Sequence, residues 1–107
     1  MNNHEELARK LKNEGNNCSY SVNNAFNDLD ISSDFPAPRS VDGKCGALLT
    51  SIKILKEKGF EDKIEEFEAW FISEFGYNKC IELMTHERRC SDYVGMCARK
   101  IDEILNI

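Results

Sequence analysis

The sequence predicts an all-α fold, a compact bundle of five or six helices. Apolar residues recur at steps of three and four along most of the chain, which is the spacing of helices that are buried on one face. No segment alternates between apolar and polar residues with the turn residues that bound a strand. The 107 residues leave room for one hydrophobic core, so residues 1–107 are predicted to form a single domain.

The first two helices are expected at about residues 5–14 and from Cys18 onward, separated by Gly15, because glycine commonly ends a helix. The apolar face of the first helix is formed by Leu7, Ala8 and Leu11. The stripe of the second helix has steps of four, three and four: Cys18, Val22, Ala25 and Leu29. Several asparagines in this segment are weak helix formers, so the second helix is expected to depend on packing.

A loop and a third helix follow. Pro36-Ala37-Pro38 and Asp42-Gly43 are turn signals, so residues 31–44 are expected to be irregular. The third helix is predicted to start near Cys45 and to end at Gly59. Its inward-facing residues are expected to be Leu48, Ile52 and Leu55.

Three more helices are expected at about residues 62–75, 78–84 and 90–105. The first has Asp62 as a candidate N-cap, Gly76 as its stop, and these expected core residues: Ile64, Phe67, Trp70, Phe71 and Phe75. The last has one stripe: Cys90, Val94, Cys97, Ile101 and Ile104. Apolar residues at these steps place one face of each helix in the core.

The composition excludes some partners. The net charge of −5 would repel phosphate, so a general nucleic-acid binder is not expected. No segment approaches the roughly 20 apolar residues that a membrane helix needs, so no membrane partner is expected. The first residues are polar and acidic, unlike a signal or transit peptide, and the expected location is the cytoplasm.

The five cysteines are the unusual feature of the chain. Cytoplasmic thiols are normally kept reduced, and an odd number leaves one thiol without a pair, so a structural disulfide framework is not expected. Four of them lie in or just before the first turn of a predicted helix: Cys18, Cys45, Cys80 and Cys90. Backbone N–H groups at that position favour a thiolate over a thiol, and the thiolate is the form that binds metal or attacks a disulfide.

These cysteines also lie in short motifs: Gly15-Asn16-Asn17-Cys18, then Gly43-Lys44-Cys45-Gly46-Ala47, then Phe75-Gly76-Tyr77-Asn78-Lys79-Cys80, and finally Cys90. In this order, and over most of the chain, they resemble the C_GCAxxG_C_C family, which is named for its cysteine pattern. The resemblance implies a helical, cysteine-based redox or metal-binding protein. The chain departs from the family at Thr50, where the second motif usually ends in glycine, and at Pro36 and Pro38, in a loop that tends to hold glycines.

The first functional hypothesis is redox activity or electron transfer at a site made of the four helix-start cysteines, which are expected to converge on one side of the bundle. They would act either as ligands of an iron–sulfur cluster or, without a metal, as a dithiol/disulfide couple. Two alternatives are a structural zinc site and a non-enzymatic helical interaction domain. The expected partner is a redox protein of unknown identity. Whether the protein is an enzyme and whether it forms a homodimer are left open.

Three further residues are candidates for a role near these cysteines. Cys97 is expected to be a buried packing residue, because Val94 and Ile101 flank it and it lacks the N–H groups of a first turn. It lies about 10.5 Å along the helix axis from Cys90, too far for a disulfide. His86 is interpreted as a solvated loop residue that could also act as a base to Cys90, and His4 as part of a terminus without a role.

Overall fold

The computed structural model describes residues 4–85 and 89–106, and in these residues it contains helices and no strand. The elements are, in chain order, α1 (His4–Asn13), α2 (Cys18–Ala25), α3 (Gly46–Glu57), the 3-10 helix η1 (Glu61–Lys63), α4 (Ile64–Phe75), α5 (Cys80–Leu83) and α6 (Cys90–Leu105). The prediction of an all-α compact bundle is confirmed. None of the helices in the described residues has the length and apolar character that spanning a membrane requires.

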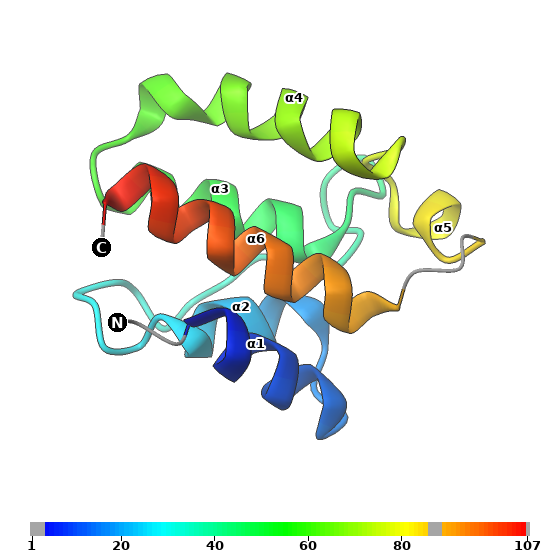
Figure 1. Ribbon diagram of the computed structural model, residues 1–107, viewed down its shortest axis with the longest axis horizontal. Coiled ribbons are helices and arrows are strands. Elements are labelled where there is room, and N and C mark those ends of the chain that lie inside the picture. The colour runs from blue at the N-terminus through cyan, green and yellow to red at the C-terminus, as the bar shows by residue number, and fades with distance from the viewer. Residues whose placement is uncertain (1–3, 86–88, 107) are drawn as a thin grey trace.

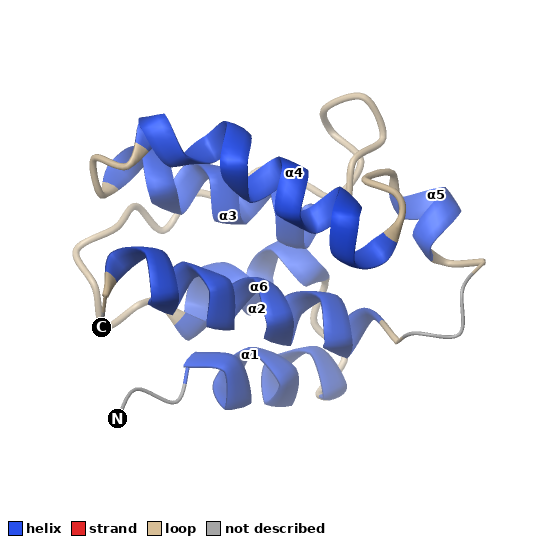
Figure 2. Cartoon of the chain, turned by 45° about the horizontal axis from the view of Figure 1, so that its top comes forward, coloured by secondary structure: helices blue, strands red, loops and turns tan. Residues whose placement is uncertain are grey.

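The last helix, α6, is the centre of the bundle. It packs against α1, α2 and α3, and α3 also packs against α2 and α4. Figure 1 shows α1 and α2 on one side of α6 and α4 on the other, and Figure 2 shows the same order from a second direction. Helices from both ends of the chain therefore enclose one core.

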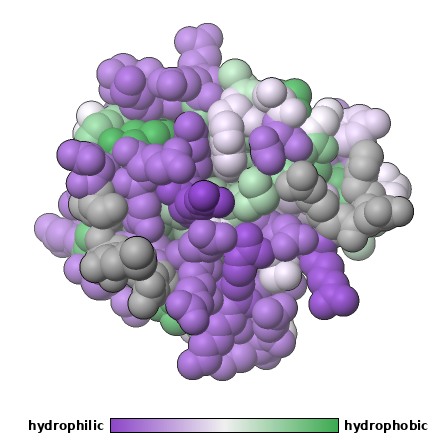
Figure 3. Space-filling model, in the orientation of Figure 1, coloured by the Kyte–Doolittle hydropathy of each residue, from purple (hydrophilic) through white to green (hydrophobic). Residues whose placement is uncertain are grey.

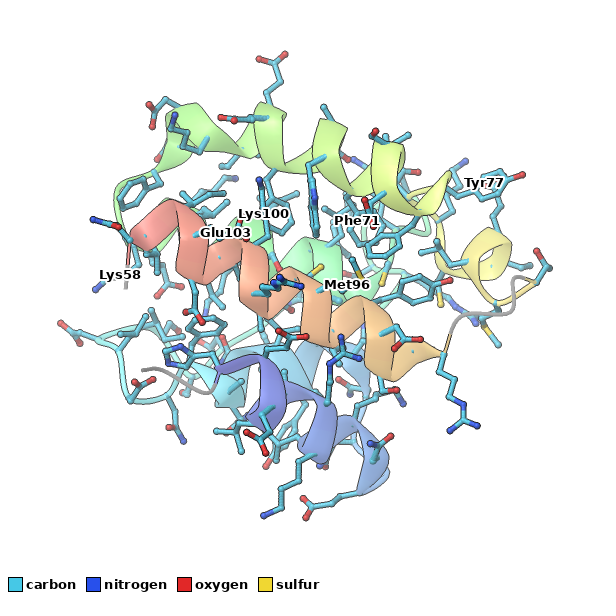
Figure 4. All side chains as sticks on the ribbon, viewed as in Figure 1. Lys58, Phe71, Tyr77, Met96, Lys100 and Glu103 are labelled. Carbon is cyan, nitrogen blue, oxygen red and sulfur yellow. The ribbon has the colours of Figure 1, made fainter. Side chains whose placement is uncertain are left out.

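Aromatic side chains from α4 fill the side of the core that faces α6. Phe67 and Phe71 are fully buried, and the Phe75 ring contacts the ring of Tyr93 on α6 at a centroid distance of 4.9 Å. Figure 4 shows Phe71 pointing from α4 towards α6. Trp70, predicted to lie in the core, is half-buried at its edge, where the Lys100 ammonium lies 5.6 Å from the centroid of its ring.

The face that α1 turns inward differs from the prediction. Leu7, expected on the apolar face, is 38% exposed, whereas His4 and Ala8 are buried and Leu11 is half-buried. The buried stripe therefore starts at His4 and continues at steps of four and three. The imidazole fits there because it stacks on the Phe26 ring, with 4.2 Å between the ring centroids.

Helix α2 is shorter than its apolar stripe. Asn17 caps its start by accepting a hydrogen bond from the Tyr20 backbone N–H at 2.7 Å, and the helix ends at Ala25, before Leu29. The Asn23 side chain faces inward and donates a hydrogen bond to the carbonyl of Ser32 in the loop that follows the helix. Leu29 still packs against the core from a turn.

The start of α4 also differs from the prediction. Asp62 does not cap this helix: it lies exposed in η1, and the N-cap position is taken by Lys63 with no side-chain hydrogen bond. A 3-10 turn precedes the helix and supplies its entry geometry in place of a side-chain cap. The expected end of α4 is confirmed, since Gly76 occupies the left-handed region at φ 87°.

Candidate thiol site

Four cysteines occupy helix starts, as the sequence predicts. Cys18, Cys80 and Cys90 are the first residues of α2, α5 and α6, and Cys45 is the N-cap of α3. All five cysteines are free thiols. Cys45 is 3% exposed, and the other three are half-buried.

Cys18 and Cys45 meet because the starts of α2 and α3 touch each other. The contact is between Ser19 and Gly46, the residues that follow the two cysteines. A Cβ atom built on Gly46 would lie only 3.1 Å from the Ser19 backbone nitrogen and would collide with the Ser19 hydroxyl oxygen. Glycine at position 46 therefore permits an approach that any other residue would prevent, and it brings the two thiols into hydrogen-bond contact.

The surroundings of this pair shift the pKa values of its two thiols in opposite directions. The Cys18 thiol donates a hydrogen bond to the Cys45 sulfur, and this bond lowers the pKa of Cys45 although burial opposes ionisation. The backbone N–H groups of Leu48 and Ala47, at the start of α3, lower it further. The same hydrogen bond raises the pKa of Cys18, so of the two thiols Cys45 is the one that ionises more readily.

Cys90 approaches this pair from α6. A charge on its sulfur raises the pKa of Cys18, whereas the Lys12 ammonium of α1 lowers it. Cys18, Cys45 and Cys90 therefore lie within electrostatic range of one another, at the place where α2, α3 and α6 start.

Cys80 is joined to Cys45 through the main chain. Lys44 and Lys79 form an isolated antiparallel bridge, in which the Cys45 N–H donates to the Asn78 carbonyl and the Cys80 N–H donates to the Gly43 carbonyl, both at 2.9 Å. The Arg39 guanidinium donates a hydrogen bond to the Cys80 sulfur, which raises the pKa of Arg39. The sequence offered no signal for Arg39, because it lies in an irregular loop.

Residues 4–85 and 89–106 contain no group of three or more histidine, cysteine or acidic side chains placed to hold a metal ion. No step of the chemistry below runs through a metal ion or a cluster.

Cys97 lies behind the pair, fully buried in α6. Burial raises its pKa well above the ordinary value, and a negative charge on Cys45 raises it further, whereas the nearby Ser51 hydroxyl lowers it. This agrees with the expected packing role. Its electrostatic interaction with Cys45 was not visible in the sequence, because it depends on how α3 packs against α6.

Two hydroxyls near the site have no hydrogen-bond partner among the described residues: Ser19 Oγ and Thr50 Oγ1. Thr50, which stands where the family motif has glycine, is fully buried in α3. Its side chain therefore fills core space that glycine would leave empty. His86 and Arg88 lie outside the described residues, and Arg89 is the exposed N-cap of α6.

A second polar cluster, which the sequence does not predict, is centred on His4. Its Nδ1 lies 2.7 Å from an Asp102 carboxylate oxygen on α6, and its Nε2 lies 2.9 Å from Asp28. The signal was present, because His4, Ala8 and Leu11 have helical spacing, but it was hidden by the position of His4 near the start of the chain.

Comparison of the chain with family models, curated proteins and solved structures gives no match. The C_GCAxxG_C_C family therefore stays a resemblance based on the four motifs, and a function has to be argued from the site.

Proposed function

We propose that this protein is a thiol–disulfide redox protein whose reactive couple is Cys18 and Cys45. The observation that carries the proposal is the close contact between Ser19 and Gly46, which brings the neighbouring Cys18 and Cys45 together at the start of α3. There the Cys18 thiol and the backbone N–H groups of Leu48 and Ala47 lower the pKa of Cys45. A thiolate beside a protonated thiol is the reduced form of a couple that closes to a disulfide.

The reaction is an exchange with a partner disulfide. The couple gives up two electrons and two protons and forms the Cys18–Cys45 bond, and the partner disulfide becomes two thiols. In the reverse direction Cys45 is the better leaving group, because its sulfur has the lower pKa of the two.

Stabilisation of the Cys45 thiolate also affects the reduction potential of the couple. Contacts that favour the reduced form make the disulfide a stronger oxidant. We therefore expect a reduction potential less negative than about −270 mV, the value of a moderately reducing dithiol protein.

The test is a redox titration of anaerobically purified protein in glutathione buffers, with free thiols alkylated and disulfides mapped by mass spectrometry. We expect one Cys18–Cys45 disulfide, lost in Cys18→Ser and Cys45→Ser and kept in the matched control Cys97→Ala. Absence of this disulfide across the whole titration would overturn the proposal. An iron–sulfur absorption spectrum, or bound zinc, in protein that lacks the disulfide would favour the metal alternatives instead.

A further inference from the structure

We propose that His4 is part of a proton-operated latch, which holds the turn after α2 against the start of α1 and releases this turn as the pH rises. The turn, named the α2 turn below, consists of residues 26–31. The latch joins three side chains from separate parts of the chain: His4 of α1, Asp28 of the α2 turn and Asp102 of α6. This inference does not depend on the proposed redox function.

The His4 ring lies inside the protein although it belongs to the first residue of α1. Its exposed fraction is 4%, and one of its faces stacks on the Phe26 ring. Figure 3 shows mostly hydrophilic side chains over α1, which lies at the bottom of the same view in Figure 1. The outer side of α1 therefore faces water, whereas His4 is held on the inner side.

Both nitrogens of this buried ring face a carboxylate. Nδ1 lies 2.7 Å from an Asp102 oxygen, and Nε2 lies 2.9 Å and 3.1 Å from the two Asp28 oxygens. A neutral imidazole has one N–H group and one nitrogen lone pair. Two such contacts to ionised carboxylates therefore need a second proton, either on the ring or on one of the two carboxyl groups.

The charges around the ring favour retention of this second proton. Burial raises the pKa of Asp102, the hydrogen bond to His4 lowers it, and the negative charges of Asp28 and Glu5 raise it again. Of the groups that act on Asp102, only His4 can carry a positive charge, and Glu5 is itself paired with Arg9 at 2.9 Å. The proton therefore relieves repulsion between the two carboxylates.

Loss of the proton breaks one of the two contacts, because a ring lone pair then faces a carboxylate oxygen. The Asp102 side chain is 16% exposed, and the Asp28 side chain is 55% exposed. Asp28 can turn towards water and also gives the proton a way out to solvent, whereas Asp102 has little access to water. The remaining N–H group therefore stays with Asp102, and the contact between His4 and Asp28 opens.

Opening of this contact loosens the α2 turn more than α1. Helix α1 also packs against α2 and α6, so it stays in place. The α2 turn has no regular secondary structure, and its short backbone hydrogen bonds include one from the Leu29 N–H to the Phe26 carbonyl at 3.0 Å. The Leu29 amide therefore reports on the state of the latch.

The experiment measures hydrogen exchange of the Leu29 amide by NMR, divided by the intrinsic exchange rate at each pH. In the wild type this protection factor should fall about tenfold or more between about pH 5 and about pH 8, because histidine titrates in this range and one hydrogen bond to a charged group is lost. In Asp28→Asn the new amide group donates to the lone pair of the neutral ring. The protection factor should therefore be the same at both pH values.

Two further variants complete the test. Asp30→Asn removes an exposed carboxylate from the same turn and should keep the pH dependence of the wild type. His4→Gln removes the titrating ring and should show no pH dependence, with lower protection at the acidic pH than the wild type. The latch is overturned if protection of Leu29 in the wild type does not change with pH, or if Asp28→Asn keeps the same fall.

Discussion

Replacement of Gly46 by alanine should separate the two thiols of the couple. The added methyl group would collide with the Ser19 hydroxyl and would lie 3.0 Å from Pro38 Cγ and 3.1 Å from the Ser19 backbone nitrogen. The hydroxyl can rotate away, but the backbone nitrogen cannot, so the starts of α2 and α3 must move apart. The hydrogen bond from Cys18 to Cys45 then lengthens, and the pKa of Cys45 rises.

The size of the effect follows from two opposing terms. Overpacking at a close contact costs about 1–3 kcal/mol. Alanine regains up to about 1 kcal/mol in helix propensity, and less than that at the first position of a helix such as α3. The free energy of unfolding should therefore fall by about 1–2 kcal/mol, as measured by urea denaturation followed by circular dichroism.

A double-mutant cycle tests the assigned cause. Ser19→Ala removes a buried hydroxyl that has no partner among the described residues, so alone it should be close to neutral. In the Ser19→Ala/Gly46→Ala variant part of the lost stability should return, because the tightest of the three close contacts is gone. The reasoning is refuted if Gly46→Ala is as stable as the wild type, or if the pKa of Cys45, followed by thiolate absorbance, does not rise.

Three further outcomes can be measured. Cys97→Ala should lower the free energy of unfolding by about 1 kcal/mol through lost packing and leave the reduction potential of the couple unchanged, as urea denaturation and redox titration would show. The free energy of unfolding should fall as the pH rises above 9.0, the ordinary thiol pKa, because the pKa of Cys97 is raised in the folded state and only the unfolded thiol ionises there. The slope of the free energy of unfolding against pH should be smaller in Cys97→Ala. Equal slopes in the two proteins would contradict the assignment. His4→Ala should cost about 2–3 kcal/mol, since it removes hydrogen bonds to two carboxylates and a ring contact, whereas Glu6→Ala in the same helix should be close to neutral in thermal unfolding.

The sequence predicts the helices well because their signals are local. Gly15, Gly59 and Gly76 end segments whose apolar residues have helical spacing, and all three adopt positive φ. The errors arose where a side chain competes with this pattern. Asn23 faces inward and bonds the following loop, and His4 takes a buried position that its polar ring and its place near the start of the chain argue against.

The site was predictable only in part. The placement of four cysteines at helix starts follows from the sequence, because both the starts and the thiols can be read from it. Which thiols meet does not follow, because that depends on the contact between Ser19 and Gly46 and on the packing of α6. Arg39 reaches Cys80 from a loop without periodicity, and no local pattern reveals such a contact.

The short bridge between Lys44 and Lys79 holds the backbone of this site in place without using the cysteine side chains. Its hydrogen bonds are donated by the main-chain N–H groups of the two cysteines themselves, so they persist when either sulfur is replaced by an oxygen or a hydrogen atom. Proline is the residue that removes a donor at these positions. The thiols can therefore be deleted one at a time while the backbone that aligns them stays in place, which makes this site open to dissection by substitution.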